Sequence, residues 1–317
     1  MEISVRQTSI RPAYIKTLLS NGILLVSHLT TFDTARLAQR TRLTLDECEQ
    51  ILAAIKPKRP HYVLKASELM IRPFERISTS IEGLDEVLGG GVQCGQITEI
   101  SGEAGAGKSN LCAQIGILVM LAKSDKGLDG DVLLIHTEGE GKLKLAIKRF
   151  NTLAASIGKE NLINERLHVI NSCNEFKLAE IINRLPEILS QKPTVKLIII
   201  DSITCAFIST DENPNFGFYA KRSLRLTKIV KMLTQIAWDQ RIAIIATNHV
   251  SYNFKFGENR PAMGKLWSHM CQTKIYLERN NASYDIVRFA HVTKGALNTP
   301  VVTKFRITND LFDHLTS

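Results

Sequence analysis

The stretch that decides the fold reads Gly102-Glu103-Ala104-Gly105-Ala106-Gly107-Lys108-Ser109. It fits the pattern G-x-x-x-x-G-K-[ST], in which the glycines let backbone N–H groups converge on phosphate oxygens. In this pattern Lys108 reaches the β- and γ-phosphates, and the Ser109 hydroxyl completes the coordination shell of Mg²⁺. These eight residues and the adjoining Asn110 are therefore predicted to bind ATP, with Mg²⁺ as its cofactor.

The segments on either side have the form that this loop requires. Gln96–Ile100 reads as a strand that enters the loop, and Leu111–Leu118 reads as an apolar helix that leaves it. The start of such a helix adds a partial positive charge where the phosphates lie. Strand, loop and helix in this order distinguish a phosphate-binding loop from a chance match in a surface loop.

Composition limits the remaining possibilities. The chain has 317 residues, 44% of them hydrophobic, and no apolar run approaches the ~18 residues that a membrane-spanning helix needs. Its net charge of +9 is compatible with a polyanionic partner such as nucleic acid, although a basic surface also serves solubility alone. The first residues lack the apolar core of a signal peptide, so we expect an intracellular protein without membrane association.

The cysteines carry no recognisable framework. Six are scattered along the chain without a CxxC pair: Cys48, Cys94, Cys112, Cys173, Cys205 and Cys271. This spacing predicts reduced, mostly buried thiols rather than disulfides or a zinc site.

The first 56 residues carry apolar side chains at helical spacing and predict a small helical N-terminal domain, residues 1–56. The expected helices are Ala13–Leu19, Thr34–Gln39 and Asp46–Ile55, the last preceded by a capping box of Thr44 and Glu47. Lys56-Pro57-Lys58-Arg59-Pro60 then breaks the pattern, so we assign residues 57–75 to a linker.

From residue 76 to residue 317 strands and helices alternate. The expected strands are Ile97–Ser101, Val132–His136, Leu167–Ile170, Lys196–Ile200 and Ile242–Thr247, and the expected helices are Lys142–Ser156, Lys177–Gln191 and Ala220–Gln240. Because the strands are apolar throughout, they belong in a parallel sheet covered on both faces. Three later segments, Thr273–Leu277, Asp285–Thr293 and Val302–Thr308, are expected to extend the sheet as an antiparallel meander. The predicted fold class is thus α/β, with a mostly parallel central sheet.

Two acids follow predicted strands, at the edge where parallel strands place ligands. Asp201 ends an apolar strand and is the candidate that holds Mg²⁺ together with Ser109. Glu138 follows Val132–His136 and is the candidate catalytic carboxylate, which would orient a water for in-line attack on the γ-phosphate. Lys108 would act with Glu138 in catalysis by stabilising charge on the transferred phosphate.

Two polar residues, Asn248 and His249, follow the strand Ile242–Thr247. We expect them to bind the nucleotide at its γ-phosphate and to signal its presence to the loop that follows. A single histidine is often a hydrogen-bonded structural residue, so this role of His249 stays open.

Several segments together resemble the RecA-type recombinase core of the eukaryotic and archaeal branch. They are Ile81–Gly91, Gly95–Gly102, His136–Gly139, Ile200–Ser202 and Ala246–His249, in the family's order and spacing. The resemblance implies a RecA-like P-loop ATPase core at residues 76–317, with a low, DNA-stimulated turnover of ATP. It also implies a role in homologous recombination and DNA repair, and therefore a location in the nucleus.

The chain departs from the strand-exchange members of that family at four places. His249 stands where they usually carry Gln, and the counterpart of their first DNA-binding loop, Ser209–Tyr219, begins with acidic residues. The counterpart of the second loop, Ser251–Met263, is short, and Thr41–Thr44 stands where they have a glycine-bearing hairpin. The chain is therefore more similar to the recombinase paralogues, which assist filament assembly.

Contacts with DNA and with other subunits have the weakest sequence signals. The DNA-binding candidates are Lys221, Arg222, Phe254, Lys255, Arg260 and Lys265, although the segment around Phe254 could equally pack on a partner or cover ATP at an interface. In the linker, Val63 and Ala66 occupy the place of the family's Phe-x-x-Ala docking motif, and they are the interface candidates. The alternative to this docking role is that Val63 is an ordinary apolar residue of the linker.

Four functions stay open from the sequence. The leading one is a recombinase paralogue that hydrolyses ATP and assists filament assembly, in a hetero-oligomer with other recombinase-family subunits and on single-stranded or branched DNA. The alternatives are a non-hydrolysing ATP-dependent scaffold subunit and a strand-exchange recombinase. A helicase-type or clock-type ATPase fits less well with the small helical module, the single core and the linker docking sequence.

Overall fold

The computed structural model describes residues 4, 5, 8, 10–30, 32–55, 73–172, 174–207, 216–253, 258–279, 287–295 and 301–307. The chain divides into two compact units, Met1–Arg72 and Pro73–Ser317, each with its own hydrophobic core. The linker bounds 57–75 stay a prediction, because residues 56–72 lie outside the described ones. Within the described residues no helix is both long and apolar enough to span a membrane.

The N-terminal unit contains four helices among its described residues: α1 (Pro12–Ser20), α2 (Val26–Thr30), α3 (Thr34–Thr41) and α4 (Leu45–Ile55). The sequence predicted all but α2, whose five residues are too few to show a helical period. The capping box is confirmed, because the Glu47 N–H donates to Thr44 Oγ1 at 3.3 Å and the Thr44 N–H donates to Glu47 Oε2 at 2.9 Å. Leu18, Leu37 and Ile51 pack together in the core of this unit.

The second unit is built on one sheet, which has nine strands in the part of the chain that the structure describes. They are β3 (Ile97–Gly102), β4 (Asp131–His136), β5 (Leu167–Asn171), β6 (Val195–Asp201), β7 (Ala243–Asn253), β8 (Glu258–Pro261), β9 (Thr273–Arg279), β10 (Val287–Lys294) and β11 (Val301–Arg306). The order is β11-β10-β9-β3-β7-β6-β4-β5, with β8 paired to β7. The six strands from β9 to β5 are parallel, and β10 and β11 are antiparallel. The predicted α/β class and the antiparallel meander are confirmed.

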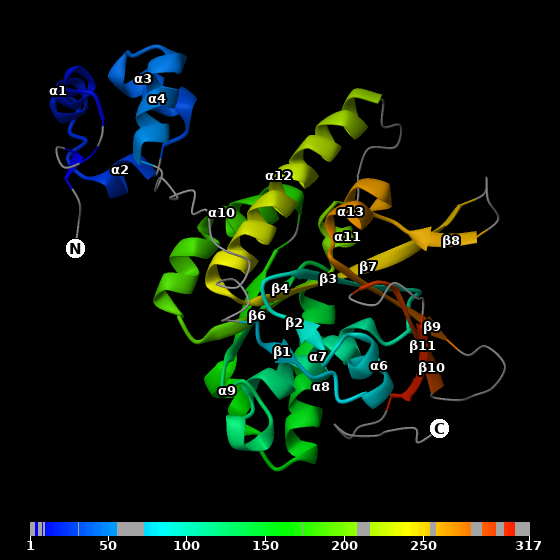
Figure 1. Ribbon diagram of the computed structural model, residues 1–317. Helices are drawn as coiled ribbons and strands as arrows, with labels where there is room; N and C mark the ends of the chain where they lie inside the picture. Colours follow the sequence, from blue (N-terminus) through cyan, green and yellow to red (C-terminus); the bar gives the residue numbers. More distant parts are fainter. Residues whose placement is uncertain are drawn as a thin grey trace. The chain divides into compact units, whose positions relative to one another are not determined.

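Helices cover both faces of the sheet (Figure 1). One core includes α7 (Lys108–Met120) and α8 (Glu140–Ser156), and the other includes α10 (Glu175–Gln191), α12 (Phe216–Gln240) and α13 (Gly264–Met270). The shorter elements are α6 (Glu82–Val87), η2 (Lys123–Asp125), α9 (Asn161–Arg166), α11 (Ile203–Ala206) and the paired strands β1 (Arg76–Ile77) and β2 (Val92–Gln93). Because side chains alternate across a strand, Ile199 joins the first core and Ile198 the second. Both faces of β6 are therefore apolar, as its sequence predicts.

The carboxyl ends of the central parallel strands meet at one edge of the sheet. Gly102 of β3 pairs with His249 of β7, and His136 of β4 pairs with Asp201 of β6. The phosphate loop follows β3 and the predicted catalytic segment follows β4. The fold therefore brings the predicted nucleotide, metal and catalytic residues to the same edge, where open α/β sheets bind ligands.

The segment 251–263 differs from the loop that the sequence predicted. Strand β7 continues past Thr247 to Asn253, and β8 pairs with it in antiparallel fashion, with Ser251 opposite Arg260. Residues 254–257 lie outside the described part of the chain. Residues 251–253 and 258–261 are thus paired strands, which the sequence did not indicate.

Candidate nucleotide-binding site

The phosphate loop joins β3 to α7, as the sequence predicted, and its glycines make the turns possible. Gly102, Gly105 and Gly107 all have positive φ, a conformation that disfavours a side chain. At Gly102 a Cβ atom would also lie 2.4 Å from the carbonyl oxygen of Leu277 on the neighbouring strand β9. The loop therefore begins where only glycine fits.

The side chain of Lys108 is buried and folded back onto the loop. Its Nζ donates hydrogen bonds to the carbonyl oxygens of Gly102 at 2.8 Å and Glu103 at 2.9 Å. Burial lowers the pKa of Lys108, and the negative charges of Asp201 and Glu138 oppose this shift. The ammonium is thus already positioned within the loop, where phosphate oxygens can replace the carbonyl groups as its partners.

Ser109 and Asp201 are in direct contact and have the chemistry of a Mg²⁺ site. The Ser109 hydroxyl donates to Asp201 Oδ2 at 2.7 Å, and the Thr247 hydroxyl donates to Asp201 Oδ1 at 2.5 Å. Hydroxyl and carboxylate oxygens are the hard donors that Mg²⁺ prefers, and Mg²⁺ keeps several waters between itself and the protein. The pair fits a nucleotide-bound Mg²⁺, which Ser109 and Asp201 would hold together.

Glu138 lies between β4 and α8, with both carboxylate oxygens engaged. Its Oε1 lies 2.6 Å from Nε2 of His249, and its Oε2 accepts from Nζ of Lys142 at 2.6 Å. The hydrogen bond from His249 is the largest cause of a lowered Glu138 pKa, with Lys142 adding to it and burial opposing it. Glu138 is therefore ionised at neutral pH, as a carboxylate that orients water must be.

Asn248 and His249 are neighbours on β7 but point to different surroundings. The amide of Asn248 is fully buried, where it donates to Glu99 Oε1 at 2.6 Å and accepts from the Thr204 hydroxyl at 2.7 Å. The Thr204 Oγ1 also accepts from the backbone N–H of His249 at 2.9 Å. The structure therefore places His249 beside Glu138, whereas the amide of Asn248 contacts Glu99 and Thr204. A contact of Asn248 with the nucleotide stays a prediction.

The phosphate loop borders one cavity of about 360 Å³ together with Glu138, Asp201 and His249. Its lining residues are Ala104, Gly105, Gly107, Lys108, Ser109, Asn110, His136, Glu138, Lys142, Leu145, Ala146, Arg149, Asp201 and His249. Four residues predicted to bind nucleotide do not line it: Gly102, Glu103, Ala106 and Asn248. The catalytic and metal candidates are thus brought together with most of the loop.

One wall of the cavity comes from α8, and the sequence reasoning missed it. Lys142, Leu145, Ala146 and Arg149 all line the cavity, and their spacing of i, i+3, i+4 and i+7 puts them on one helix face. Burial lowers the pKa of Arg149. The helix itself was predicted, so this periodicity was the available signal for the wall.

A family model described as Rad51 matches residues 72–310, well over half of the chain. The chain belongs to the Rad51 family. Rad51-family proteins are RecA-like, act in DNA recombination and repair, bind ATP with Mg²⁺, bind DNA and form oligomers. The RecA-like core that the sequence resembled is therefore confirmed.

In this Rad51-family chain the DNA-binding candidates fall on adjoining elements. Lys221 and Arg222 lie on α12, Arg260 on β8 and Lys265 on α13. The guanidinium of Arg222 lies 3.8 Å from the Met263 sulfur, just before α13. The remaining candidates, Phe254 and Lys255 for DNA and Val63 and Ala66 for an interface, lie outside the described residues.

Proposed function

We propose that this chain is a recombinase paralogue that binds and hydrolyses ATP and assists recombinase filament assembly in homologous-recombination DNA repair. Membership of the Rad51 family supports the recombination role. The observation that carries the ATPase part is that Glu138, Asp201 and Ser109 border the same cavity as the phosphate loop. A metal-holding pair and an ionised carboxylate around one phosphate site are the parts that phosphoryl transfer to water requires.

Each residue has a separate task in this mechanism. Lys108 exchanges its carbonyl partners for the β- and γ-phosphates, while Ser109 and Asp201 position the metal side of the nucleotide. When bound, Mg²⁺ neutralises negative charge on the phosphates. Glu138 orients the attacking water, and His249, whose Nε2 lies 2.6 Å from Glu138, holds that carboxylate in place. The proposed turnover is low and stimulated by DNA.

Two features support the proposed role of a paralogue over that of a strand-exchange recombinase. The Nε2 atom of His249 contacts both Glu138 and Cys205. The strand-exchange proteins usually carry Gln at this position. The acidic start of the segment 209–219 also weakens the case for strand exchange. We therefore place the chain in a nuclear hetero-oligomer with other recombinase-family subunits, in contact with single-stranded or branched DNA.

Two substitutions separate the ATPase from a non-hydrolysing scaffold. Glu138→Gln keeps the shape of the side chain and is expected to reduce turnover by about 10²–10⁴-fold, because an amide cannot polarise water as a carboxylate does. Lys108→Ala is expected to weaken ATP binding itself. ATPase rates with and without DNA, ATP affinity and recovery of co-purifying subunits would be compared in the wild type and both variants.

The outcomes discriminate between the functions. If only Lys108→Ala weakens subunit assembly, ATP binding is sufficient for that role. Intact ATP binding with no turnover in the chain or its complex contradicts the ATPase and favours the scaffold. Efficient strand exchange by the purified chain alone contradicts the paralogue assignment.

A further inference from the structure

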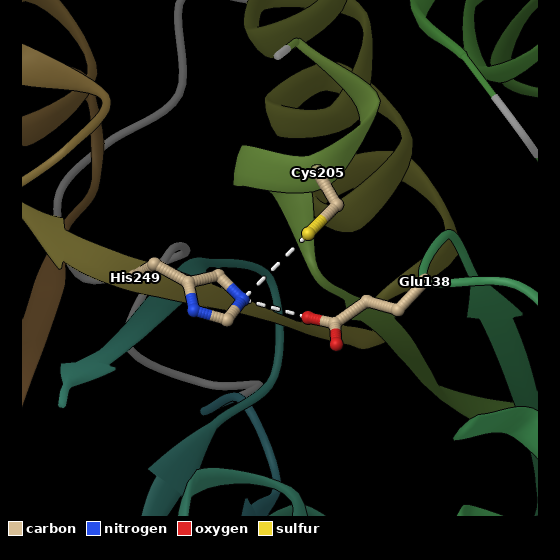
Figure 2. A group of neighbouring side chains, drawn as sticks. All are labelled: Glu138, Cys205 and His249. Carbon is tan, nitrogen blue, oxygen red and sulfur yellow. Dashed lines mark hydrogen bonds and ion pairs between the residues drawn. The ribbon is translucent and has the colours of Figure 1, made fainter. Parts of the chain in front are cut away.

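Three side chains with metal-ligating atoms converge beside the nucleotide cavity from three separate elements (Figure 2). Glu138 follows β4, Cys205 lies on α11 and His249 lies on β7. The Nε2 atom of His249 is 3.7 Å from Cys205 Sγ and 2.6 Å from Glu138 Oε1. All three ligand atoms lie within 4.8 Å of one another.

We propose that Glu138, Cys205 and His249 form a site for Zn²⁺, and that Zn²⁺ bound there inhibits ATP hydrolysis. Thiolate, imidazole and carboxylate are the three side-chain groups that bind Zn²⁺, and three protein ligands with an open fourth position are a common set. With Zn–S and Zn–N bonds of 2.3 and 2.0 Å, tetrahedral ligand atoms lie about 3.5 Å apart. The sulfur-to-nitrogen distance already matches, and the shorter nitrogen-to-oxygen distance has to open by less than ~1 Å.

The surroundings allow a metal ion to enter and hold two of the ligands in place. The side chain of His249 is 30% exposed and Cys205 is half-buried, so neither is sealed in the core. The backbone N–H of Cys205 donates to the Ser202 hydroxyl at 3.2 Å, and that of His249 donates to the Thr204 hydroxyl at 2.9 Å. These contacts fix the backbone at both ligands and leave the ligand atoms directed at each other.

Lys142 is the group that opposes a cation here. Its ammonium contacts Glu138 Oε2, whereas the oxygen that faces His249 is Oε1. Because the Lys142 side chain is 63% exposed, it can turn into solvent when a metal ion binds. Bound Zn²⁺ would displace the thiol proton of Cys205 to solvent, and His249 would bind through Nε2 as a neutral imidazole with its proton on Nδ1.

The inhibitory part of this inference rests on the proposed ATPase function. A metal ion on Glu138 Oε1 and His249 Nε2 removes both groups from the water and the γ-phosphate, while Lys108 and Ser109 stay available to the nucleotide. The Mg²⁺ pair Ser109 and Asp201 offers only oxygen, and this second cluster offers sulfur and nitrogen. The two sites therefore differ in metal preference.

The test measures metal binding to the full chain without reference to its activity. Zn²⁺ is titrated against a chromophoric chelator, and Co²⁺ is used as a spectroscopic substitute whose thiolate absorption reports ligation by cysteine. The wild type is expected to bind one Zn²⁺ that Cys205→Ser binds at least ~100-fold more weakly, since loss of a ligand exceeds the 10–100-fold cost of losing an outer partner. Lys142→Gln is expected to bind Zn²⁺ more tightly.

The matched control is Cys48→Ser, a buried thiol of the N-terminal unit beside the Thr41 hydroxyl, which should leave Zn²⁺ affinity unchanged. Thermal unfolding of each variant establishes that it is folded. Equal Zn²⁺ affinity and Co²⁺ spectra in the wild type and Cys205→Ser would overturn the site. Zn²⁺ bound at the site without slower ATP hydrolysis would overturn the inhibition. If the chain has no ATPase activity, the proposed function fails while the titration still decides the site.

Discussion

The Ser109 hydroxyl donates a 2.7 Å hydrogen bond to Asp201 Oδ2 across the sheet edge. Ser109 stands in the first turn of α7, and Asp201 ends β6, two strands away from β3 in the sheet. A hydroxyl and a carboxylate this close together have the spacing needed to share one hydrated cation. The fold itself thus brings the two candidate Mg²⁺-binding side chains together.

Asp201→Asn is expected to weaken the Mg²⁺ dependence of ATP binding without unfolding the protein. The amide keeps the size of the side chain and can still accept from Ser109, but it lacks the negative charge that holds hydrated Mg²⁺. The Mg²⁺ concentration for half-maximal ATP binding should rise on the order of tenfold or more. Nucleotide titrations at increasing Mg²⁺ measure this change.

The control for that substitution is Asp239→Asn, on an exposed turn of α12. It removes the same charge at a distance from the cavity and should leave the Mg²⁺ dependence unchanged. An equal effect of both variants would show that net charge, and not the contact with Ser109, is responsible.

Arg149→Gln is expected to weaken ATP binding about tenfold, or about 1.4 kcal/mol. Arg149 lines the cavity from α8 and supplies a cation to a site that must hold a polyanion. Its neighbour Lys148 is exposed and does not line the cavity, so Lys148→Gln removes the same charge as a control. Titration with a fluorescent ATP analogue compares them, and similar affinities for the two variants would contradict a role for the α8 wall.

Thr204→Val is expected to lower the free energy of unfolding by about 1–3 kcal/mol, because it leaves buried polar groups without their partner. The Thr204 hydroxyl accepts from the His249 N–H and donates to Asn248 Oδ1. Thr204→Ser keeps the hydroxyl and should retain most of this stability. Urea unfolding measures both variants. Equal losses would mean that the methyl group contributes as much as the hydrogen bonds, which would contradict this prediction.

Substitution by alanine is expected to change stability in opposite directions at two glycines, Gly102 and Gly141. Gly102→Ala is expected to destabilise the protein by about 1–3 kcal/mol, since its Cβ would meet the carbonyl oxygen of Leu277 at 2.4 Å. Gly141→Ala, on α8 with no atom within 4 Å of the added Cβ, should stabilise it by about 0.4–1 kcal/mol. Thermal unfolding of the two variants decides this, and a neutral Gly102→Ala would contradict the close approach of β9.

The sequence was sufficient to predict those elements whose hydrophobic pattern is local. The apolar run Leu197–Ile200 predicted a strand buried on both faces, and β6 has that environment. The sequence was insufficient to predict on which face of β7 the Asn248 side chain lies. Residues 243–246 of β7 are apolar and buried on both faces, so no alternation in the sequence reveals which face Asn248 lies on.

The cluster of Glu138, Cys205 and His249 shows a different limit. The sequence predicted no zinc site, because its cysteines lack metal-ligand spacing. The three side chains come from three elements that are 67 and 44 residues apart (205 − 138 and 249 − 205) and meet only through the sheet order β4-β6-β7. Spacing rules detect ligands on one loop, whereas this arrangement depends on tertiary structure.

Strand β7 sets a fixed distance between the nucleotide cavity and the strand pair β7–β8. From His249 at the cavity the strand continues to Ser251, whose partner is Arg260 on β8. At ~3.3 Å per residue, Arg260 is paired about 7 Å beyond the histidine. A one-residue deletion in this stretch would turn the side chains that follow to the opposite face of the sheet. The number of residues between His249 and Ser251 is therefore fixed by the requirement that both keep their faces of the sheet.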